Sequence, residues 1–167
     1  MQNSMRHAGA RSVRTDGYRE RLGPSLWILV AAAVAAPMAA LVVTPIDTTV
    51  ALLVGAGVGI LLIAVLIAAA PIVEVRDGEL RAGRAHIDVG FLGAPEVHLG
   101  DDARHARGAG LHPRSWHLIR GGIDGVVVIP VTDADDPTTA WVISSRTPDR
   151  LAAAVRRAQL TRRTPSR

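Results

Sequence analysis

Residues 50–73, VALLVGAGVGILLIAVLIAAAPIV, form an apolar run of 24 residues without a charge. At about 1.5 Å of rise per residue, a helix of that length measures about 36 Å, which exceeds the roughly 30 Å of a bilayer's hydrocarbon core. A soluble core helix this long needs a polar face, whereas the least apolar residues here are three glycines and Pro71. The run therefore predicts a transmembrane helix.

A second apolar run precedes it over residues 26–43, with Trp27 near its start and Pro37 inside it. We expect Trp27 and the arginines before it to anchor this helix at the membrane interface, and Pro37 to kink it. The long charged segment before the run favours an uncleaved helix over a cleaved signal peptide. The link TPIDTT at 44–49 then turns the chain back, so residues 18–73 are predicted to form a transmembrane helical hairpin with spans at 26–43 and 50–73.

The arginine positions predict the orientation of this hairpin. Five arginines precede the first helix, none lies in the link, and Arg76, Arg81 and Arg84 follow the second helix. Because basic residues concentrate on the cytoplasmic side of membrane spans, both termini are expected in the cytoplasm. The predicted location is therefore the plasma membrane, as a multi-pass protein.

Composition narrows the function classes. The chain has no cysteine, which excludes disulfides, thiolate metal ligands and a cysteine nucleophile. All 19 basic residues are arginine, and the net positive charge lies in residues 1–25 and 161–167, whereas residues 74–160 carry eleven arginines against twelve acids. A nucleic-acid-binding domain concentrates basic residues on its folded part, so nucleic acid is not an expected partner.

Within the second helix, Gly55, Gly57 and Gly59 allow two interpretations. A phosphate-binding loop requires a strand before the glycines and a helix after them, which this apolar setting does not offer. Gly55 and Gly59 instead have the small-xxx-small spacing that lets helix backbones approach closely. We predict a packing face here, directed either at the first helix or at another subunit.

The remaining residues predict a cytoplasmic β-rich domain over 74–160, between a disordered arm at 1–17 and a basic tail at 161–167. Asp77-Gly78 between alternating apolar segments is a strong β-hairpin signal. Further short strands are expected at 85–92, 95–99, 115–119, 125–132 and 138–145, whereas residues 100–113 form either a loop or one short helix. This spacing favours a small antiparallel β-barrel or sandwich.

A C-terminal helix is predicted over 148–160. Thr147 is a candidate N-cap, Pro148 suits the first helical position, and Leu151, Val155 and Ala158 share one face. A β-meander closed by one C-terminal helix is the architecture of pleckstrin-homology-like (PH-like) modules. The predicted fold class is thus a two-helix transmembrane hairpin followed by a small PH-like β domain.

Several polar residues are candidates for chemistry, each with a simpler interpretation. The spacing of His98, His105, His112 and His117 matches no zinc signature, which favours scattered surface histidines over a metal site. Asp133, Asp135 and Asp136 lack the glycine and distal glutamate of a calcium loop, and a solvated turn is expected. Ser144 and Ser145 have no nucleophile-elbow motif around them. No catalytic, cofactor-binding or metal-ligating residue is therefore predicted.

Two kinds of large side chain remain. Trp116 and Trp141 alternate with apolar neighbours, which favours core or half-buried strand positions over a ligand platform. Arg146 follows Ser144-Ser145 at a strand end and is a candidate for anion or partner contact, with surface solvation as the simpler alternative. Together with Arg76, Arg81 and Arg84, it would read an anionic headgroup if the domain binds lipid.

Four segments make the chain resemble the DUF3093 family of uncharacterised, alanine-rich actinobacterial membrane proteins. They are YRERL at 18–22, DGELRAGRAHI at 77–87, DPTTAW at 136–141 and SSRTPDRL at 144–151, and the likeness runs over residues 18–155. The resemblance implies a location and a layout rather than an activity, because the family has no established catalytic residues.

The leading functional hypothesis is a non-enzymatic integral membrane protein. Its hairpin would hold the β-rich domain at the cytoplasmic membrane face, where the domain contacts a protein partner or a second copy of the chain. An anionic lipid- or ligand-binding module is the alternative, and a membrane-bound enzyme is the third choice. Apart from the lipid bilayer and such a protein, no partner or cofactor is expected.

Overall fold

The computed structural model describes residues 17–163. Apart from Gly17, the predicted disordered arm lies outside the described residues, as does the predicted basic tail beyond Arg163. The two termini, whose cytoplasmic placement is predicted, likewise lie outside the described residues.

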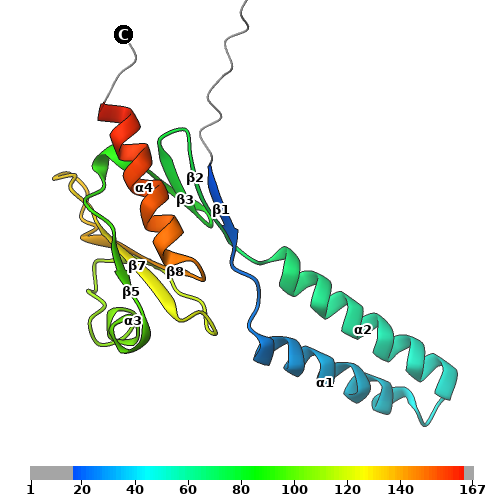
Figure 1. Cartoon of the computed structure of the whole chain (residues 1–167). Helices are drawn as coiled ribbons and strands as arrows, with labels where there is room; N and C mark the ends of the chain where they lie inside the picture. The colour runs from blue at the N-terminus through cyan, green and yellow to red at the C-terminus, as the bar shows by residue number, and fades with distance from the viewer. Residues whose placement is uncertain (1–16, 164–167) are drawn as a thin grey trace, which may run out of the picture.

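Two antiparallel helices project from the rest of the molecule as a hairpin (Figure 1). Helix α1 (Leu26–Val43) has the predicted bounds and contains Pro37. Helix α2 (Thr48–Ala68) begins two residues earlier than predicted, because the Asp47 side chain caps it by accepting a hydrogen bond of 2.9 Å from the Val50 amide. The helix also ends five residues before the predicted limit at 73.

The early end of α2 corrects the predicted span. Pro71 cannot continue a helix, and the two β-branched residues after it, Ile72 and Val73, join a strand instead. The apolar run 50–73 thus contains most of α2 and the first residues of β2. Hydropathy alone does not show where the helix ends and the strand begins.

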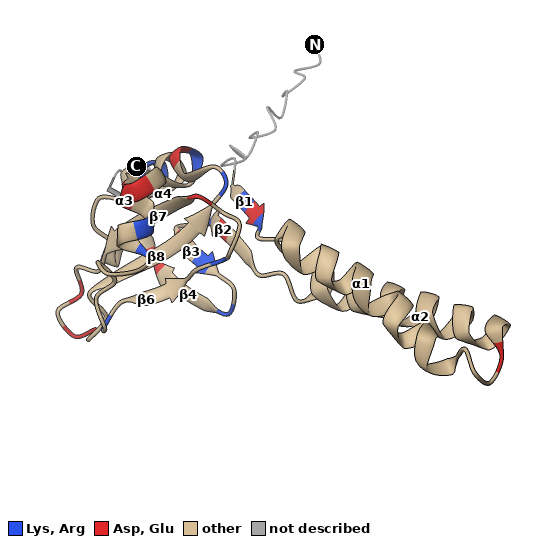
Figure 2. Cartoon of the chain, turned by 90° about the horizontal axis from the view of Figure 1, so that it is seen from below, with Lys and Arg blue, Asp and Glu red and all other residues tan. Residues whose placement is uncertain are grey.

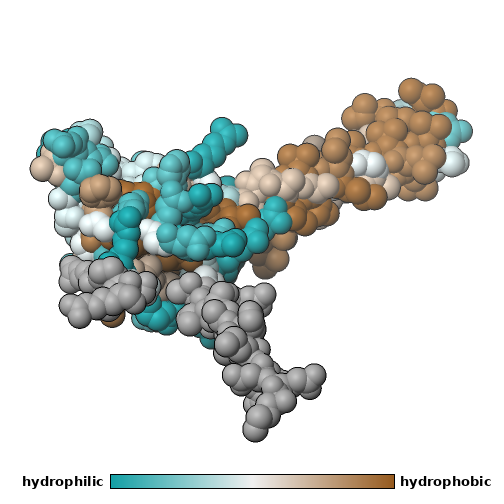
Figure 3. Space-filling view, turned by 90° about the horizontal axis from the view of Figure 1, so that it is seen from above, coloured by the Kyte–Doolittle hydropathy of each residue, from teal (hydrophilic) through white to brown (hydrophobic). Residues whose placement is uncertain are grey.

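The hairpin is exposed over nearly its whole surface. Only 6% of the residues in α1 and 11% in the apolar window of α2 are buried, although both helices are long and apolar enough to cross a membrane. Figure 3 shows apolar side chains covering the hairpin, next to a largely hydrophilic domain. These are not core helices of a soluble fold, since core helices bury at least one face.

The two helices contact each other through small residues. A Cβ atom placed on Gly55 would lie 2.8 Å from the Cβ of Ala40 and 2.9 Å from the carbonyl oxygen of Ala36, and one on Gly59 would lie 3.0 Å from the Ala36 Cβ. Both glycines are buried. The packing face therefore points at α1 within the same chain, whereas a Cβ on Gly57 would meet nothing within 4 Å.

Gly55→Leu is expected to force α1 and α2 apart and to cost roughly 1–3 kcal/mol, the usual range for overpacking a close contact. Thermal unfolding of the detergent-solubilised protein, followed by helical circular dichroism, measures the effect. Gly57→Leu is the matched control, because it gains the same helix propensity at a position open to the surroundings. Equal melting of the two variants would contradict the packing role of Gly55.

The first sheet begins before the hairpin. Strand β1 (Tyr18–Arg21) pairs antiparallel with β2 (Ile72–Arg76), which is followed in order by β3 (Glu79–Ala82) and β4 (Ala85–Asp88). The Leu22 amide continues the first ladder by donating to the Pro71 carbonyl at 2.9 Å. Residues 18–22, predicted as part of the membrane unit, thus belong to the β-rich domain, and the hairpin is inserted between two neighbouring strands.

The second sheet has the order β5-β7-β8-β6. Its strands are β5 (Glu96–His98), β6 (Trp116–Leu118), β7 (Gly125–Pro130) and β8 (Ala140–Ser145). The predicted all-antiparallel meander needs correction here, because β6 runs parallel to β8. Helix α3 (Gly100–Ala106) lies in the stretch for which a loop or one short helix was expected, and the 3-10 turn η1 (Val89–Phe91) follows β4.

Helix α4 (Pro148–Arg163) packs against strands of both sheets and completes the core (Figure 1). It starts at the predicted residue and ends three residues later than expected. Trp141 is 5% exposed and stacks on the half-buried Trp116 with ring centroids 4.2 Å apart, which confirms the predicted core positions. The main core combines both sheets with α4: Leu22, Val73, Val75, Leu80, Val127, Ile129, Ile143, Leu151 and Val155.

Candidate functional site

The outer face of the first sheet is lined with charges of both signs. Val73, Val75, Leu80 and Ala82 point into the core, so their strand neighbours point outward. The register aligns these outward residues in two rows across the strands: Arg19, Glu74, Arg81 and His86 in one, and Arg76, Glu79 and Asp88 in the other.

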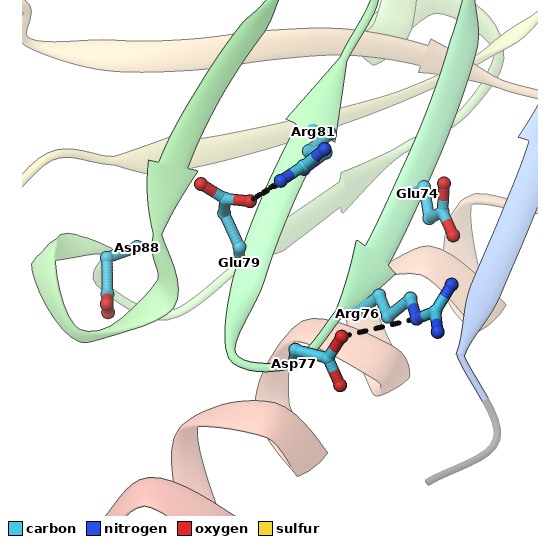
Figure 4. Close-up of a pocket in the computed structure, with 6 residues that line it drawn as sticks. All are labelled: Glu74, Arg76, Asp77, Glu79, Arg81 and Asp88. Atoms are coloured by element: carbon cyan, nitrogen blue, oxygen red, sulfur yellow. Dashed lines mark hydrogen bonds and ion pairs between the residues drawn. The ribbon is translucent and has the colours of Figure 1, made fainter. Parts of the chain in front are cut away.

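An open hollow of about 420 Å3 lies on this face. Its lining consists of four carboxylates and two guanidiniums, an excess of two negative charges: Glu74, Arg76, Asp77, Glu79, Arg81 and Asp88 (Figure 4). Arg81 is 2.6 Å from Glu79, Arg76 is 3.2 Å from Asp77, and Asp88 pairs with Arg162 of α4. Among the described residues, Glu74 has no ion-pair partner, and it adds to the negative excess.

The four arginines proposed for anion contact lie in two places. Arg76 and Arg81 line the hollow, where each already pairs with a carboxylate. Arg84 lies in the turn after β3, next to Gly83, whose amide donates to Ile72 at the start of β2. Arg146 follows β8, and its guanidinium donates to the carbonyls of Arg21 and Gly23, at 3.3 and 3.4 Å.

A second polar group joins β1 to the end of β8. We call it the Glu20 cluster; its members are Tyr18, Glu20, Ser145, Arg146 and Thr147. The Glu20 carboxylate accepts from the Tyr18 hydroxyl at 2.5 Å, the Ser145 hydroxyl at 2.6 Å and the Arg146 amide at 2.8 Å. Tyr18 also lies 3.1 Å from the Ser145 hydroxyl and 3.0 Å from that of Thr147.

The Glu20 cluster was not predicted as a unit. YRERL and SSRTPDRL were each noted in the sequence, but nothing in either segment shows that they meet. The only signal was that both carry the family resemblance. The contact fixes the strand before the hairpin to the start of the last helix.

Burial of the Tyr18 hydroxyl, together with the neighbouring Glu20 carboxylate, raises the pKa of Tyr18 above its ordinary value of 10.0. The protonated phenol is thus favoured by folding. Its contribution to stability is complete below the unfolded-state pKa and disappears as the pH rises through the higher folded-state pKa.

Tyr18 is the single tyrosine of the chain, so its ionisation can be followed directly. We expect the tyrosinate absorbance band of the folded protein to appear at higher pH than in the urea-unfolded protein, where the pKa is about 10. Glu20→Gln should bring the two titrations closer together, because it removes the neighbouring charge. Coincident titrations of folded and unfolded wild-type protein would contradict the burial of this hydroxyl.

The two serines considered as nucleophiles are both fully buried. Ser144 accepts from the Arg120 amide at 3.1 Å, and Ser145 donates to Glu20 and accepts from the Thr147 amide at 3.0 Å. These hydroxyls therefore satisfy buried backbone and side-chain groups at the end of β8.

The histidines and aspartates considered for metal binding are dispersed. Within residues 17–163, no group of three or more histidine, aspartate or glutamate side chains has an arrangement that could hold a metal ion. His112 lies 3.3 Å from the Thr139 hydroxyl and accepts from the Arg114 amide. Asp136 accepts from the Thr138 amide at 2.8 Å, and this backbone hydrogen bond lowers its pKa. A turn of this kind is what the sequence predicted for 133–136.

Fold and site together define a class: a β-rich domain of two sheets and a C-terminal helix, with an exposed apolar helical hairpin inserted after its first strand. The chain belongs to the DUF3093 family, described as a protein of unknown function, whose family model matches residues 17–155. No curated protein and no solved structure matches this chain. The matched range runs from the first strand into α4, so it includes both sheets, the hairpin and the Glu20 cluster.

Proposed function

We propose that this is a non-enzymatic integral membrane protein whose hairpin holds the β-rich domain at the cytoplasmic face of the plasma membrane. The supporting observation is the insertion of the hairpin between β1 and β2, which are hydrogen-bonded neighbours. Because the two strands lie side by side, the chain leaves and re-enters the domain at one place. Two crossings would then return it to the side from which it started.

The distribution of charge supports the orientation. Figure 2 shows no basic residue on the hairpin, and acid only at its far end, where Asp47 caps α2. The arginines of the described residues lie on the domain side of both helices. Arginines on the side from which a hairpin without basic residues projects are the pattern of a cytoplasmic domain.

The charged outer face of the first sheet is the proposed contact surface for a protein partner or a second copy of the chain. Its paired charges give a polar surface with defined geometry, which favours specificity and reversible association over permanent burial. The excess of carboxylates in the hollow fits a partner segment that carries arginine or lysine. A PH-like architecture is part of the proposal: the position of α4 supports it, and the parallel pairing of β6 with β8 counts against it.

Crosslinking in native membranes, followed by purification in mild detergent, tests the proposal. We expect a consistent partner or a homo-oligomer, and Glu79→Arg should reduce its yield, because it puts a positive charge into the hollow that would receive the partner's arginine or lysine. Asp101→Arg is the matched control, since Asp101 forms a similar pair with Arg104 on α3, at 2.7 Å. Recovery of monomer alone, or an equal loss with both variants, would count against this surface.

A further inference from the structure

Four arginines surround the place where the hairpin leaves the domain. We call the connecting residues 22–25 and 69–71 the hairpin root. The arginines are Arg21, Arg84, Arg120 and Arg146. Each of them, or a residue within two positions of it, contacts the root or the ends of β2 and β8 beside the root.

Arg21 and Arg84 lie at the end of the first sheet that adjoins the root. Arg21 is paired in register with Ile72, and the Ile72 carbonyl accepts from the Gly83 amide at 2.8 Å, which places the turn with Arg84 in the same row. A Cβ on Gly83 would lie 3.7 Å from the Cβ of Pro71 in the root. Both arginine side chains are exposed.

Arg146 and Arg120 reach the root from the second sheet. The Arg146 guanidinium donates to the carbonyls of Arg21 and Gly23, so two of its five N–H groups lie against the segment between β1 and α1. The Arg120 amide is fixed by the buried Ser144 hydroxyl. Two residues later, a Cβ on Gly122 would lie only 2.9 Å from Ser25, which precedes α1.

The acids near this end do not cancel the four positive charges. Glu20 accepts three hydrogen bonds within its cluster, so its carboxylate is already bound to Tyr18, Ser145 and the Arg146 amide. Asp124 is the exposed acid in the loop that follows Arg120. The hollow on the sheet face has the opposite balance, with four carboxylates and two arginines.

This inference rests on the membrane placement of the proposed function. Given that placement, the depth of the root in the bilayer determines which lipid groups the four arginines contact. The apolar helices end at Leu26 and Ala68, so the root lies in the headgroup layer, which is about 5–8 Å thick on each side of the hydrocarbon core. Phosphate groups lie at that depth, and guanidinium is the side chain best suited to bind them in bidentate fashion.

We infer that Arg21, Arg84, Arg120 and Arg146 form a binding site for the phosphates of anionic phospholipids at the hairpin root. This set replaces Arg76 and Arg81 of the sequence-based hypothesis, which lie on the sheet face and are paired with carboxylates. The site would hold the domain in one orientation against the bilayer and leave the charged sheet face for a protein partner.

Lipid titration of the full-length protein in non-ionic detergent, with bound lipids counted by native mass spectrometry, tests the inference. We expect phosphatidylglycerol to be retained in preference to phosphatidylcholine. Arg84→Gln and Arg146→Gln should each weaken phosphatidylglycerol binding about fivefold. Arg146→Lys should weaken it less than Arg146→Gln, because lysine keeps the charge but not the bidentate geometry. Arg76→Gln is the control at the other end of the same sheet, and it should bind like the wild type.

Two results would overturn the inference: equal retention of the two lipids by the wild-type protein, or an equal loss with Arg76→Gln and Arg84→Gln. Alkaline carbonate extraction of native membranes separates this failure from that of the proposed function. Release of the protein by carbonate refutes the membrane placement itself. Retention of the protein, combined with no preference for phosphatidylglycerol, refutes the lipid site alone.

Discussion

Replacing residues 23–70 by a loop of about five residues that contains Asn-Gly is expected to yield a water-soluble, folded β-rich domain. The deletion removes both apolar helices and leaves β1 and β2, which already pair antiparallel up to the hydrogen bond from Leu22 to Pro71. A two-residue turn is too short, because Pro71 has no amide with which to close it. Cell fractionation, size-exclusion chromatography and circular dichroism measure the outcome.

The core predicts that this shortened protein unfolds cooperatively. Every residue of the main core lies outside the deleted segment, including Leu22 and Val73 at its borders. The same deletion combined with Val73→Asp is the negative control, since it buries an unpaired charge at a position with no exposed surface. A shortened protein that stays with the membrane fraction would show a second anchor, and a soluble but unfolded one would show that the domain depends on the hairpin.

Glu20→Ala is expected to lower the free energy of unfolding by roughly 3 kcal/mol. The carboxylate accepts hydrogen bonds from Tyr18, Ser145 and the Arg146 amide, and a hydrogen bond to a charged group contributes about 1.5–3 kcal/mol. Alanine also leaves the buried Ser145 hydroxyl without the acceptor to which it donates. Urea unfolding in detergent, followed by tryptophan fluorescence, measures the change.

Two companion variants separate the charge of Glu20 from its shape. Glu20→Gln keeps an acceptor oxygen and should cost less than half as much as alanine. Ser145→Ala removes one donor but leaves the carboxylate bound to Tyr18 and Arg146, so its effect should also be smaller. A Glu20→Ala protein as stable as the wild type would show that the cluster does not fix β1 to the domain.

Local patterns in the sequence were sufficient for much of the fold. The bounds of α1, the apolarity of both helices, the start of α4 at Pro148 and the turn at Asp77-Gly78 were all predicted correctly. Asp77 and Gly78 have positive φ values of 53° and 80°, as a tight hairpin turn requires. Each of these features depends on residues that are close together in the sequence, so a local pattern can predict it.

The errors concern pairing between distant segments. Strand β1 has only four residues, three of them charged, so neither hydropathy nor strand propensity distinguishes it from a polar lead-in to a helix. The parallel pairing of β6 with β8 depends on how the chain crosses the domain, and no local signal encodes it. The contact of Arg146 with an anion or a partner stays a prediction. Its contacts with the Arg21 and Gly23 carbonyls join segments that are far apart in the sequence, so no local pattern could predict them.

The insertion of the hairpin after β1 has a consequence during synthesis. Tyr18 and Glu20 leave the ribosome first, but their strand partners in β2 follow only after both helices have been made. If only one helix crosses the bilayer, β1 and β2 end on opposite faces and the first sheet cannot close. In the proposed membrane placement, completion of the sheet therefore requires the two helices to cross as a pair, and a chain with one crossing would offer proteases an unfolded domain to degrade.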